Sequence, residues 1–70
     1  MTLKEATLRT EYVVKSINIE DPEVAAFLFS LGLYSGETIA VIQKRKSGCI
    51  VVIKDAKYSI DKQLAEAIII

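Results

Sequence analysis

Histidine and tryptophan are absent from this 70-residue sequence, and Cys49 is its single cysteine. A disulfide within the chain is therefore excluded, and a structural zinc site lacks most of the nitrogen and sulfur ligands that it needs. Nucleophilic catalysis needs a base beside the nucleophile, and histidine is the commonest base. The only close pair of glycines, Gly32 and Gly36, lacks the Lys-Ser/Thr of a phosphate-binding loop. We expect no enzyme, no metal site and no cofactor.

An excess of charge of either sign is also missing. Lysine and arginine number nine, as do aspartate and glutamate, so the net charge is zero. Nucleic-acid-binding domains usually carry a basic excess. No apolar stretch approaches the roughly 18 residues that cross a bilayer, and residues 1–5 show no signal-peptide run. We expect one domain over residues 1–70, cytoplasmic, with no nucleic-acid partner and no direct membrane insertion.

Apolar residues, by contrast, are abundant for so short a chain. They make up 51% of the sequence, and the mean hydropathy is +0.34. A small domain has proportionally more surface than a large one, and should therefore be more polar. The excess has two interpretations. Some apolar surface faces a partner, or a dense β core together with the apolar tail 67–70 accounts for it.

Residues 22–31 have the end signals of an α-helix. Asp21 can accept hydrogen bonds from the free amides of the first turn, and Pro22 suits the first helical position. Gly32 can adopt the left-handed conformation that ends a helix. At about 100° per residue, four apolar side chains fall on one stripe, namely Val24, Phe27, Leu28 and Leu31. We expect the helix to pack on the rest of the domain through that stripe.

Runs of β-branched and aromatic residues predict strands in the remaining sequence. They cover residues 12–19, 37–44, 49–54, 57–60 and 68–70. The run 49–54 is almost continuously apolar, which favours burial on both faces of its strand. Asp61 can cap a helical turn over residues 63–66. About five strands, one helix after the first and a helical turn before the last predict a mainly β fold, a small closed barrel, because closure removes exposed strand edges.

Three segments follow one another in a recognisable order. Segment 28–39 (LFSLGLYSGETI) is an apolar helix that ends in Leu-Gly-Leu, followed by a second glycine and a β-branched strand. The chain opens with LKEA at residues 3–6 and closes with LAEAIII at residues 64–70. In order and spacing they resemble the FeoA-like family of ferrous-iron uptake systems across essentially the whole chain. The resemblance implies an SH3-like barrel.

Departures from the family pattern lie in loops. Ser35 stands where the family commonly has proline, which makes that turn less rigid, and Ala56 stands where relatives often have glycine. The hairpin 44–48 is short and basic, where relatives often carry a longer loop with proline. These are positions where a partner could be recognised.

The resemblance also implies a function. It implies a non-enzymatic cytoplasmic accessory protein that docks on the FeoB-like membrane GTPase that carries ferrous iron. The same fold occurs as the C-terminal domain of iron-dependent repressors, so a metal-responsive regulatory domain is an alternative. A generic peptide-binding SH3-like module is a third hypothesis.

Several residues with reactive or charged side chains have a structural explanation. Glu20, Asp21 and Glu23 form a local acidic cluster, which helix capping and the helix dipole explain. Cys49 begins an apolar strand and is expected to act as a small hydrophobic core residue. The basic tip 44–46 could contact phosphate or an acidic protein, but a solvated hairpin is favoured, and no aromatic residue for RNA stacking lies beside it.

The outer side of the predicted helix is the best candidate for a binding surface. It carries Ala25, Ala26, Phe29 and Ser30. Together with Tyr34, the residues Ala25, Ala26 and Phe29 would form a contiguous apolar patch, which is typical of interaction sites. We predict that these four residues bind a protein partner or a second copy of the chain.

Overall fold

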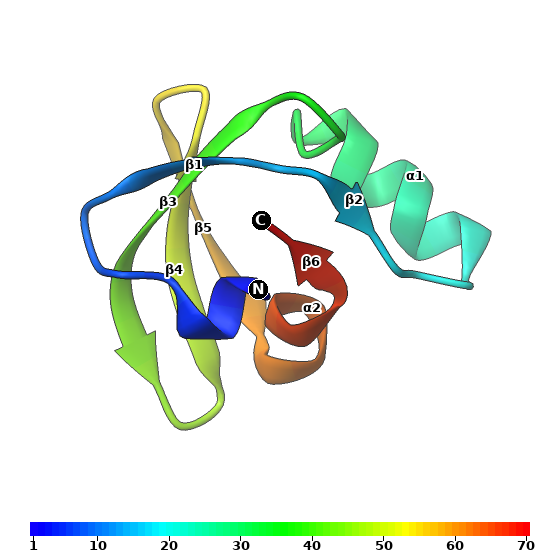
Figure 1. Ribbon diagram of the computed structural model, residues 1–70. Helices are drawn as coiled ribbons and strands as arrows, with labels where there is room; N and C mark the ends of the chain where they lie inside the picture. The colour runs from blue at the N-terminus through cyan, green and yellow to red at the C-terminus, as the bar shows by residue number, and fades with distance from the viewer.

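The computed structural model describes all 70 residues of the chain (Figure 1). Strands predominate, with two α-helices and an opening 3-10 turn. In chain order, the elements are η1 (Leu3–Glu5), β1 (Glu11–Val13), β2 (Ser16–Ile17), α1 (Pro22–Ser30), β3 (Thr38–Arg45), β4 (Gly48–Ile53), β5 (Ala56–Asp61), α2 (Lys62–Ala67) and β6 (Ile68–Ile69). No helix has both the length and the apolar character needed to span a membrane.

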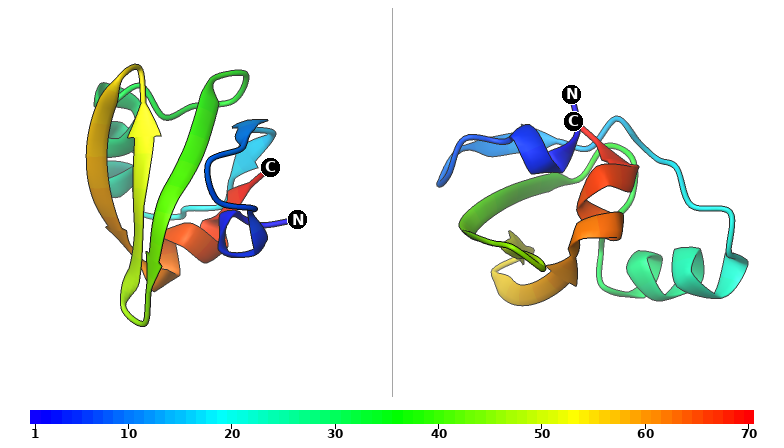
Figure 2. Two further views of the ribbon diagram at one scale, coloured as in Figure 1. Left: turned by 90° about the vertical axis from the view of Figure 1, so that its left-hand side faces the viewer. Right: turned by 90° about the horizontal axis from the view of Figure 1, so that it is seen from below.

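The six strands form two antiparallel sheets, with the orders β1-β3-β4-β5 and β2-β6. In Figure 2, β3, β4 and β5 form one curved layer, and α2 and η1 lie against each other near one end of it. This confirms the predicted mainly β, SH3-like barrel. The predicted strand 12–19 is two strands because its backbone changes partner. Val14 N–H donates to the Glu37 carbonyl beside β3, whereas Lys15 N–H donates to the Ile69 carbonyl in β6.

Fourteen side chains form one buried hydrophobic cluster that includes no phenylalanine or tyrosine. Along β4, buried and half-buried residues alternate, so that Cys49, Val51 and Ile53 enter the core while Ile50 and Val52 stay half-exposed. The prediction that this strand is buried on both faces is therefore wrong. Only one face of the curved sheet has a core to pack against, and the other meets solvent.

Both predicted ends of α1 are confirmed. Asp21 Oδ1 accepts from Glu23 N–H at 2.9 Å, and Pro22 occupies the first helical position. At the other end, Gly32 has φ +93°. Gly32 N–H donates to the Phe29 carbonyl and Leu33 N–H to the Leu28 carbonyl, both at 3.0 Å. This paired arrangement is a Schellman motif.

The contact between α1 and the barrel is narrower than the predicted stripe. Of the nine helical residues, only Leu28 is fully buried, and Figure 2 shows α1 at the periphery of the molecule. Val24 and Leu31 pack partly against the core. Phe27, predicted to belong to the buried stripe, is 59% exposed. Leu28 takes the buried position of the helix, and Phe27, about 100° away around it, is left largely in contact with solvent.

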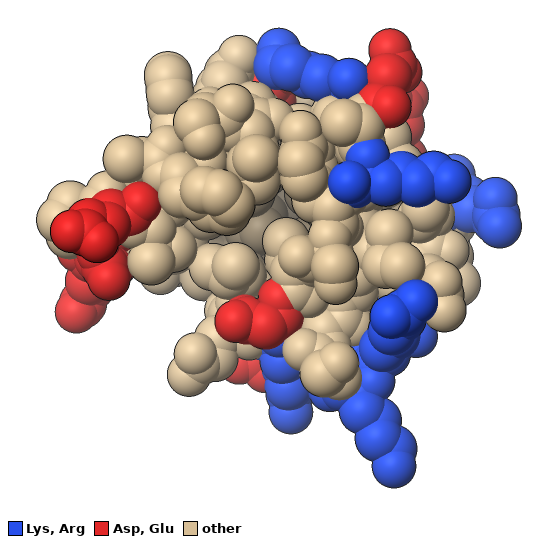
Figure 3. Space-filling model, turned by 180° about the vertical axis from the view of Figure 1, so that it is seen from behind, with Lys and Arg blue, Asp and Glu red and all other residues tan.

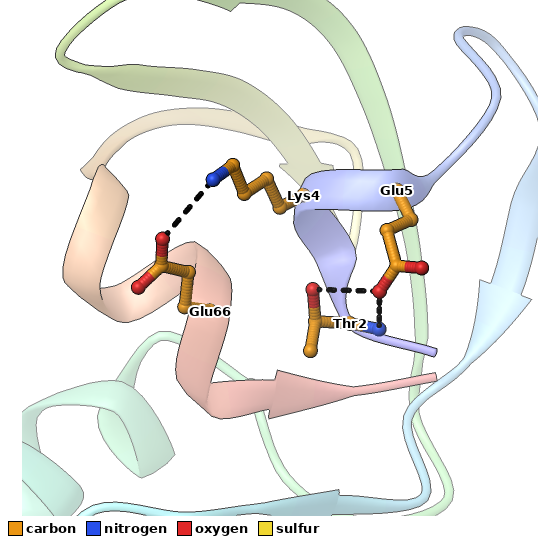
Figure 4. Close-up of polar contacts among 4 residues, drawn as sticks. All are labelled: Thr2, Lys4, Glu5 and Glu66. Carbon is orange, nitrogen blue, oxygen red and sulfur yellow. Dashed lines mark hydrogen bonds and ion pairs between the residues drawn. The ribbon is translucent and has the colours of Figure 1, made fainter.

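One ion pair joins the N-terminal turn to α2, and local hydrogen bonds order each of the two elements (Figure 4). Lys4 Nζ lies 3.3 Å from Glu66 Oε1, and Thr2 N–H donates to Glu5 Oε1 at 2.9 Å. The predicted cap of α2 is present, since Asp61 Oδ1 accepts from Leu64 N–H at 2.8 Å. Lys62 N–H donates to the Ser47 carbonyl at 2.9 Å, which places the start of α2 beside the β3–β4 turn.

Gly48 permits the close approach of β4 to β5. A Cβ at this position would collide with the Ile60 carbonyl oxygen and lie 2.8 Å from Asp61 Cα. We predict that Gly48→Ala lowers the free energy of unfolding by about 1–3 kcal/mol, because the obstacle is backbone and cannot rotate away. Urea unfolding checks this, with the exposed neighbour Ser47→Ala as control, expected within about 0.5 kcal/mol of the parent. Equal stability of the parent and Gly48→Ala would contradict it.

The Glu5 contacts predict a pH dependence. The hydrogen bond from the Thr2 backbone N–H lowers the pKa of Glu5 below its ordinary value. A lowered folded-state pKa stabilises the fold above the unfolded-state value, and this contribution is lost as the pH falls through the folded-state pKa. Glu5→Gln keeps an acceptor oxygen but does not titrate. Thermal unfolding at pH 6 and pH 3 should therefore show a smaller loss of stability in Glu5→Gln than in the parent, and equal losses would refute this role.

Candidate functional site

The four predicted partner-binding residues lie at the outer side of α1 and just beyond its end. Ala25, Ala26 and Phe29 are exposed, and Tyr34 is half-buried. Phe29 is 65% exposed, more than any other large hydrophobic side chain of the chain. Its ring stacks against that of Tyr34, with centroids 5.0 Å apart and ring planes tilted by 35°. We call these four residues the aromatic face.

The helix end places the two rings together. In the Schellman motif, Leu28 and Leu33 are joined by a backbone hydrogen bond, and both side chains are fully buried. Phe29 and Tyr34 each follow one of these leucines in the sequence. As each leucine points into the core, the next residue is left on the outer side. The two aromatic rings therefore meet outside the barrel, directly above their buried neighbours.

The rest of the aromatic face follows from helix geometry. Ala25 and Ala26 precede Phe29 by four and three residues, the spacings at which helical side chains are neighbours. Phe27 lies about 200° around the helix from Phe29 and so belongs to a different side. The prediction that Ala25, Ala26, Phe29 and Tyr34 are placed together agrees with the geometry, and their binding role stays a prediction.

A charged pair borders the aromatic face. Lys54 Nζ lies 3.0 Å from Glu37 Oε2 and 5.6 Å from the centre of the Tyr34 ring, within the range of a cation–π contact. The Lys54 stem runs past Gly32, where a Cβ would come within 2.8 Å of it. The hydrogen bond to Glu37 raises the pKa of the Lys54 ammonium above its ordinary value. Lys54 therefore stays charged at neutral pH.

Lys54 and Glu37 were not among the predicted site residues. Lys54 lies in the two-residue turn between β4 and β5, where Lys54 and Asp55 both have positive φ, as in a type I′ hairpin. Twenty residues separate it from Tyr34 in the sequence. No local pattern signals that a turn lysine reaches the end of a distant helix. Only the folded sheet brings the two together.

The turn after Tyr34 is tied to the barrel by a side chain. Ser35 Oγ donates to the Lys15 carbonyl at 2.9 Å. Gly36 N–H donates to the Val14 carbonyl at 2.8 Å. The turn is therefore held by hydrogen bonds at two successive residues, Ser35 and Gly36.

The other residues considered as candidate sites have structural partners. Cys49 is 5% exposed in the core, and its burial raises the pKa of the thiol. Asp21 caps α1. No group of three or more His, Cys, Asp or Glu side chains is placed to hold a metal ion.

Comparisons with known proteins point to one family. The chain matches the family model of the FeoA domain over residues 1–70. It is similar to the solved structure of an iron uptake regulatory protein, FeoA, with 26% identity, a TM-score of 0.83, and coverage of 97% of this chain and 91% of that one. Comparison with curated protein sequences found no match.

Two further solved structures share the fold. The zinc complex of FeoA from Stenotrophomonas maltophilia, described as an SH3 domain protein, is 24% identical with a TM-score of 0.82, over 99% of this chain and 87% of that one. A manganese-dependent transcriptional repressor is 21% identical with a TM-score of 0.85, over 97% of this chain and 39% of that one. The apolar tail of this chain is part of its core, since Ile68 and Ile70 are buried.

Two adjacent helix residues allow a test of whether Phe29 is needed for folding. We predict that Leu28→Ala lowers the free energy of unfolding by about 2–5 kcal/mol, because a fully buried leucine leaves a cavity. Phe29→Ala should cost less than about 1 kcal/mol, because most of the ring is already in contact with water. Urea unfolding of both variants measures the difference. A cost for Phe29→Ala as large as that for Leu28→Ala would make Phe29 a core residue.

Proposed function

Because the chain belongs to the FeoA domain family, we propose that it is a non-enzymatic cytoplasmic accessory protein of a ferrous-iron uptake system. It acts by docking on a FeoB-like membrane GTPase. The family is linked to ferrous-iron transport, and the S. maltophilia relative has been proposed to act as a ferrous-iron transport activating factor. The observation that carries the docking proposal is the exposed Phe29 ring stacked on the half-buried Tyr34.

Burial of the aromatic face would supply binding free energy. Covering a phenylalanine ring contributes about 1.5–3 kcal/mol, and aromatic residues are frequent among the few residues that dominate interfaces. Phe29 already stacks on Tyr34 before any partner arrives. Less side-chain freedom is then lost on binding, which favours affinity. Ala25 and Ala26 add apolar surface without bulk, so a partner can approach the helix closely.

The border of the aromatic face supports the same proposal. Interfaces commonly have an apolar centre and a polar rim. The Lys54–Glu37 ion pair forms such a rim beside Tyr34. Charged rim residues mainly influence association rate and the choice of partner. Lys54 and Glu37 would therefore contribute to specificity, and Phe29 to affinity.

The size of the aromatic face favours a transient contact over a permanent dimer. It has four residues, whereas stable interfaces use roughly 20–30 residues on each side. An interface of this size gives a weak contact, so the chain can bind the membrane transporter and dissociate from it again. A second copy of this chain is the alternative occupant, and the experiment below distinguishes the two.

We predict that Phe29→Lys weakens binding to the cytoplasmic part of the FeoB-like GTPase by about 10- to 150-fold, the equivalent of losing one buried aromatic side chain. Phe27→Lys is the matched control, since it places the same charge on the same helix but on another side. Its affinity should stay close to that of the parent. Isothermal titration calorimetry measures all three proteins.

Size-exclusion chromatography of the three proteins alone accompanies the titration. If the parent were a dimer that Phe29→Lys dissociates, the aromatic face would be a self-association surface. If Phe29→Lys bound the GTPase as tightly as the parent and kept its oligomeric state, the aromatic face would have no docking role.

A further inference from the structure

A cleft of about 310 Å³ lies between the β3–β4 turn, η1 and the start of α2. Five of the chain's nine basic residues line it, namely Lys4, Lys44, Arg45, Lys46 and Lys62. No acidic residue lines it. We call it the basic cleft. A chain with zero net charge therefore concentrates more than half of its cations around one concavity.

Most of these cations lack a counter-charge. Lys4 pairs with Glu66 at 3.3 Å, and the only other ion pair of the structure joins Lys54 to Glu37. Lys44, Arg45, Lys46 and Lys62 thus make no ion pair. In Figure 3, basic side chains gather at the lower right, and acidic ones lie at the lower centre and at the far left. Closely spaced like charges repel one another, so an anion in the cleft would relieve that repulsion.

The basic cleft is more than a solvated hairpin tip. Lys4 and Lys62 come from η1 and α2, far from the hairpin in sequence, and line the same concavity as its three cations. Lys62 N–H donates to the Ser47 carbonyl at 2.9 Å, which fastens the start of α2 to the β3–β4 turn. The floor is built from the buried core residues Leu3, Cys49 and Ala65. A firm floor ringed by cations suits a binding site.

We propose that the basic cleft binds a small, soluble, phosphate-bearing anion. A guanidinium can grip a phosphate through two parallel hydrogen bonds, and lysines add point charges around it. The volume is at the lower end of the roughly 300–1,000 Å³ of small-molecule sites. RNA is disfavoured because no aromatic side chain lines the cleft for base stacking, and so small a concavity does not hold an extended acidic segment.

This proposal is independent of the docking proposal. The basic cleft lies at the Gly48 end of β4, whereas Lys54, which borders the aromatic face, follows its other end at Ile53. No residue of the aromatic face lines the basic cleft. Failure of one proposal therefore leaves the other standing.

The test is titration of the isotope-labelled protein with pyrophosphate at an ionic strength of about 0.15 M, close to physiological. We expect saturable shifts of the backbone amide signals of residues 44–48 and 62. The variant carrying both Arg45→Gln and Lys62→Gln should bind about 10-fold or more weakly, since two charge-assisted contacts are lost. The double variant Lys15→Gln with Lys57→Gln changes net charge equally outside the cleft, and should bind nearly as the parent does.

Two further arms identify the source of the anion. Vesicles containing phosphatidylglycerol test a lipid headgroup, and a short oligoglutamate peptide tests an acidic protein segment. The proposal is overturned if millimolar pyrophosphate gives no saturable shift, or if both double variants lose affinity equally. The proposal is also overturned if the protein binds the vesicles but does not bind pyrophosphate, or if it binds oligoglutamate more tightly than pyrophosphate. Because all four substituted side chains are exposed, each variant should keep the dispersed spectrum of the folded protein.

Discussion

Burial of aliphatic side chains in a single core is the constraint on which the whole structure depends. The fourteen buried hydrophobic residues come from the N-terminal turn, both helices, β3 to β6 and the loops between them. A chain of 70 residues with one cysteine cannot be braced by disulfides, and a small domain has little core to spare. Strands β1 and β2 contribute no fully buried residue, but their partly buried Tyr12 and Ile17 pack against the same cluster. The barrel is the shape that lets short strands do so while pairing most of their backbone groups.

This core accepts no large aromatic ring among its fully buried side chains. Its members are leucine, isoleucine, valine, alanine and one cysteine, which interdigitate over the narrow interior of a small barrel. The two phenylalanines lie on α1, where Leu28 is the only fully buried residue. A helix held through Leu28 and closed by the Leu28–Leu33 backbone hydrogen bond then presents its rings outward. The aromatic face is in this sense a by-product of how the helix is anchored.

The fold also determines where the charged side chains lie. The β3–β4 hairpin carries three consecutive cations, and the packing of η1 and α2 beside it adds Lys4 and Lys62. At the opposite end of β4, Lys54 is paired with Glu37 and sits against Tyr34. Strand β4 thus separates the aromatic face, where Lys54 is paired with Glu37, from the basic cleft, where Lys4 alone of the five cations is in an ion pair. The two surfaces suit different kinds of ligand, an apolar protein surface and a small anion.

Much of the fold was predictable because its signals are local. Asp21, Pro22 and Gly32 specify both ends of α1, and Asp61 specifies the start of α2. The alternation of Ile39 and Val41 marks the buried face of β3. Local sequence patterns gave wrong predictions where contacts with distant parts of the chain decide the structure. The 12–19 segment splits because its backbone pairs first with β3 and then with β6. Phe27 is exposed because Leu28 takes the buried position of the helix.

The candidate sites divide in the same way. The sequence by itself determined that Ala25, Ala26 and Phe29 share one side of a helix, because helical spacing depends only on the distance along the chain. It also determined the family, through motifs that extend along the whole chain. Only the tertiary structure decided that Lys54 borders Tyr34 and that Lys4 and Lys62 join the basic hairpin. Those contacts link residues far apart in sequence, and they exist only once the core has drawn the strands and α2 together.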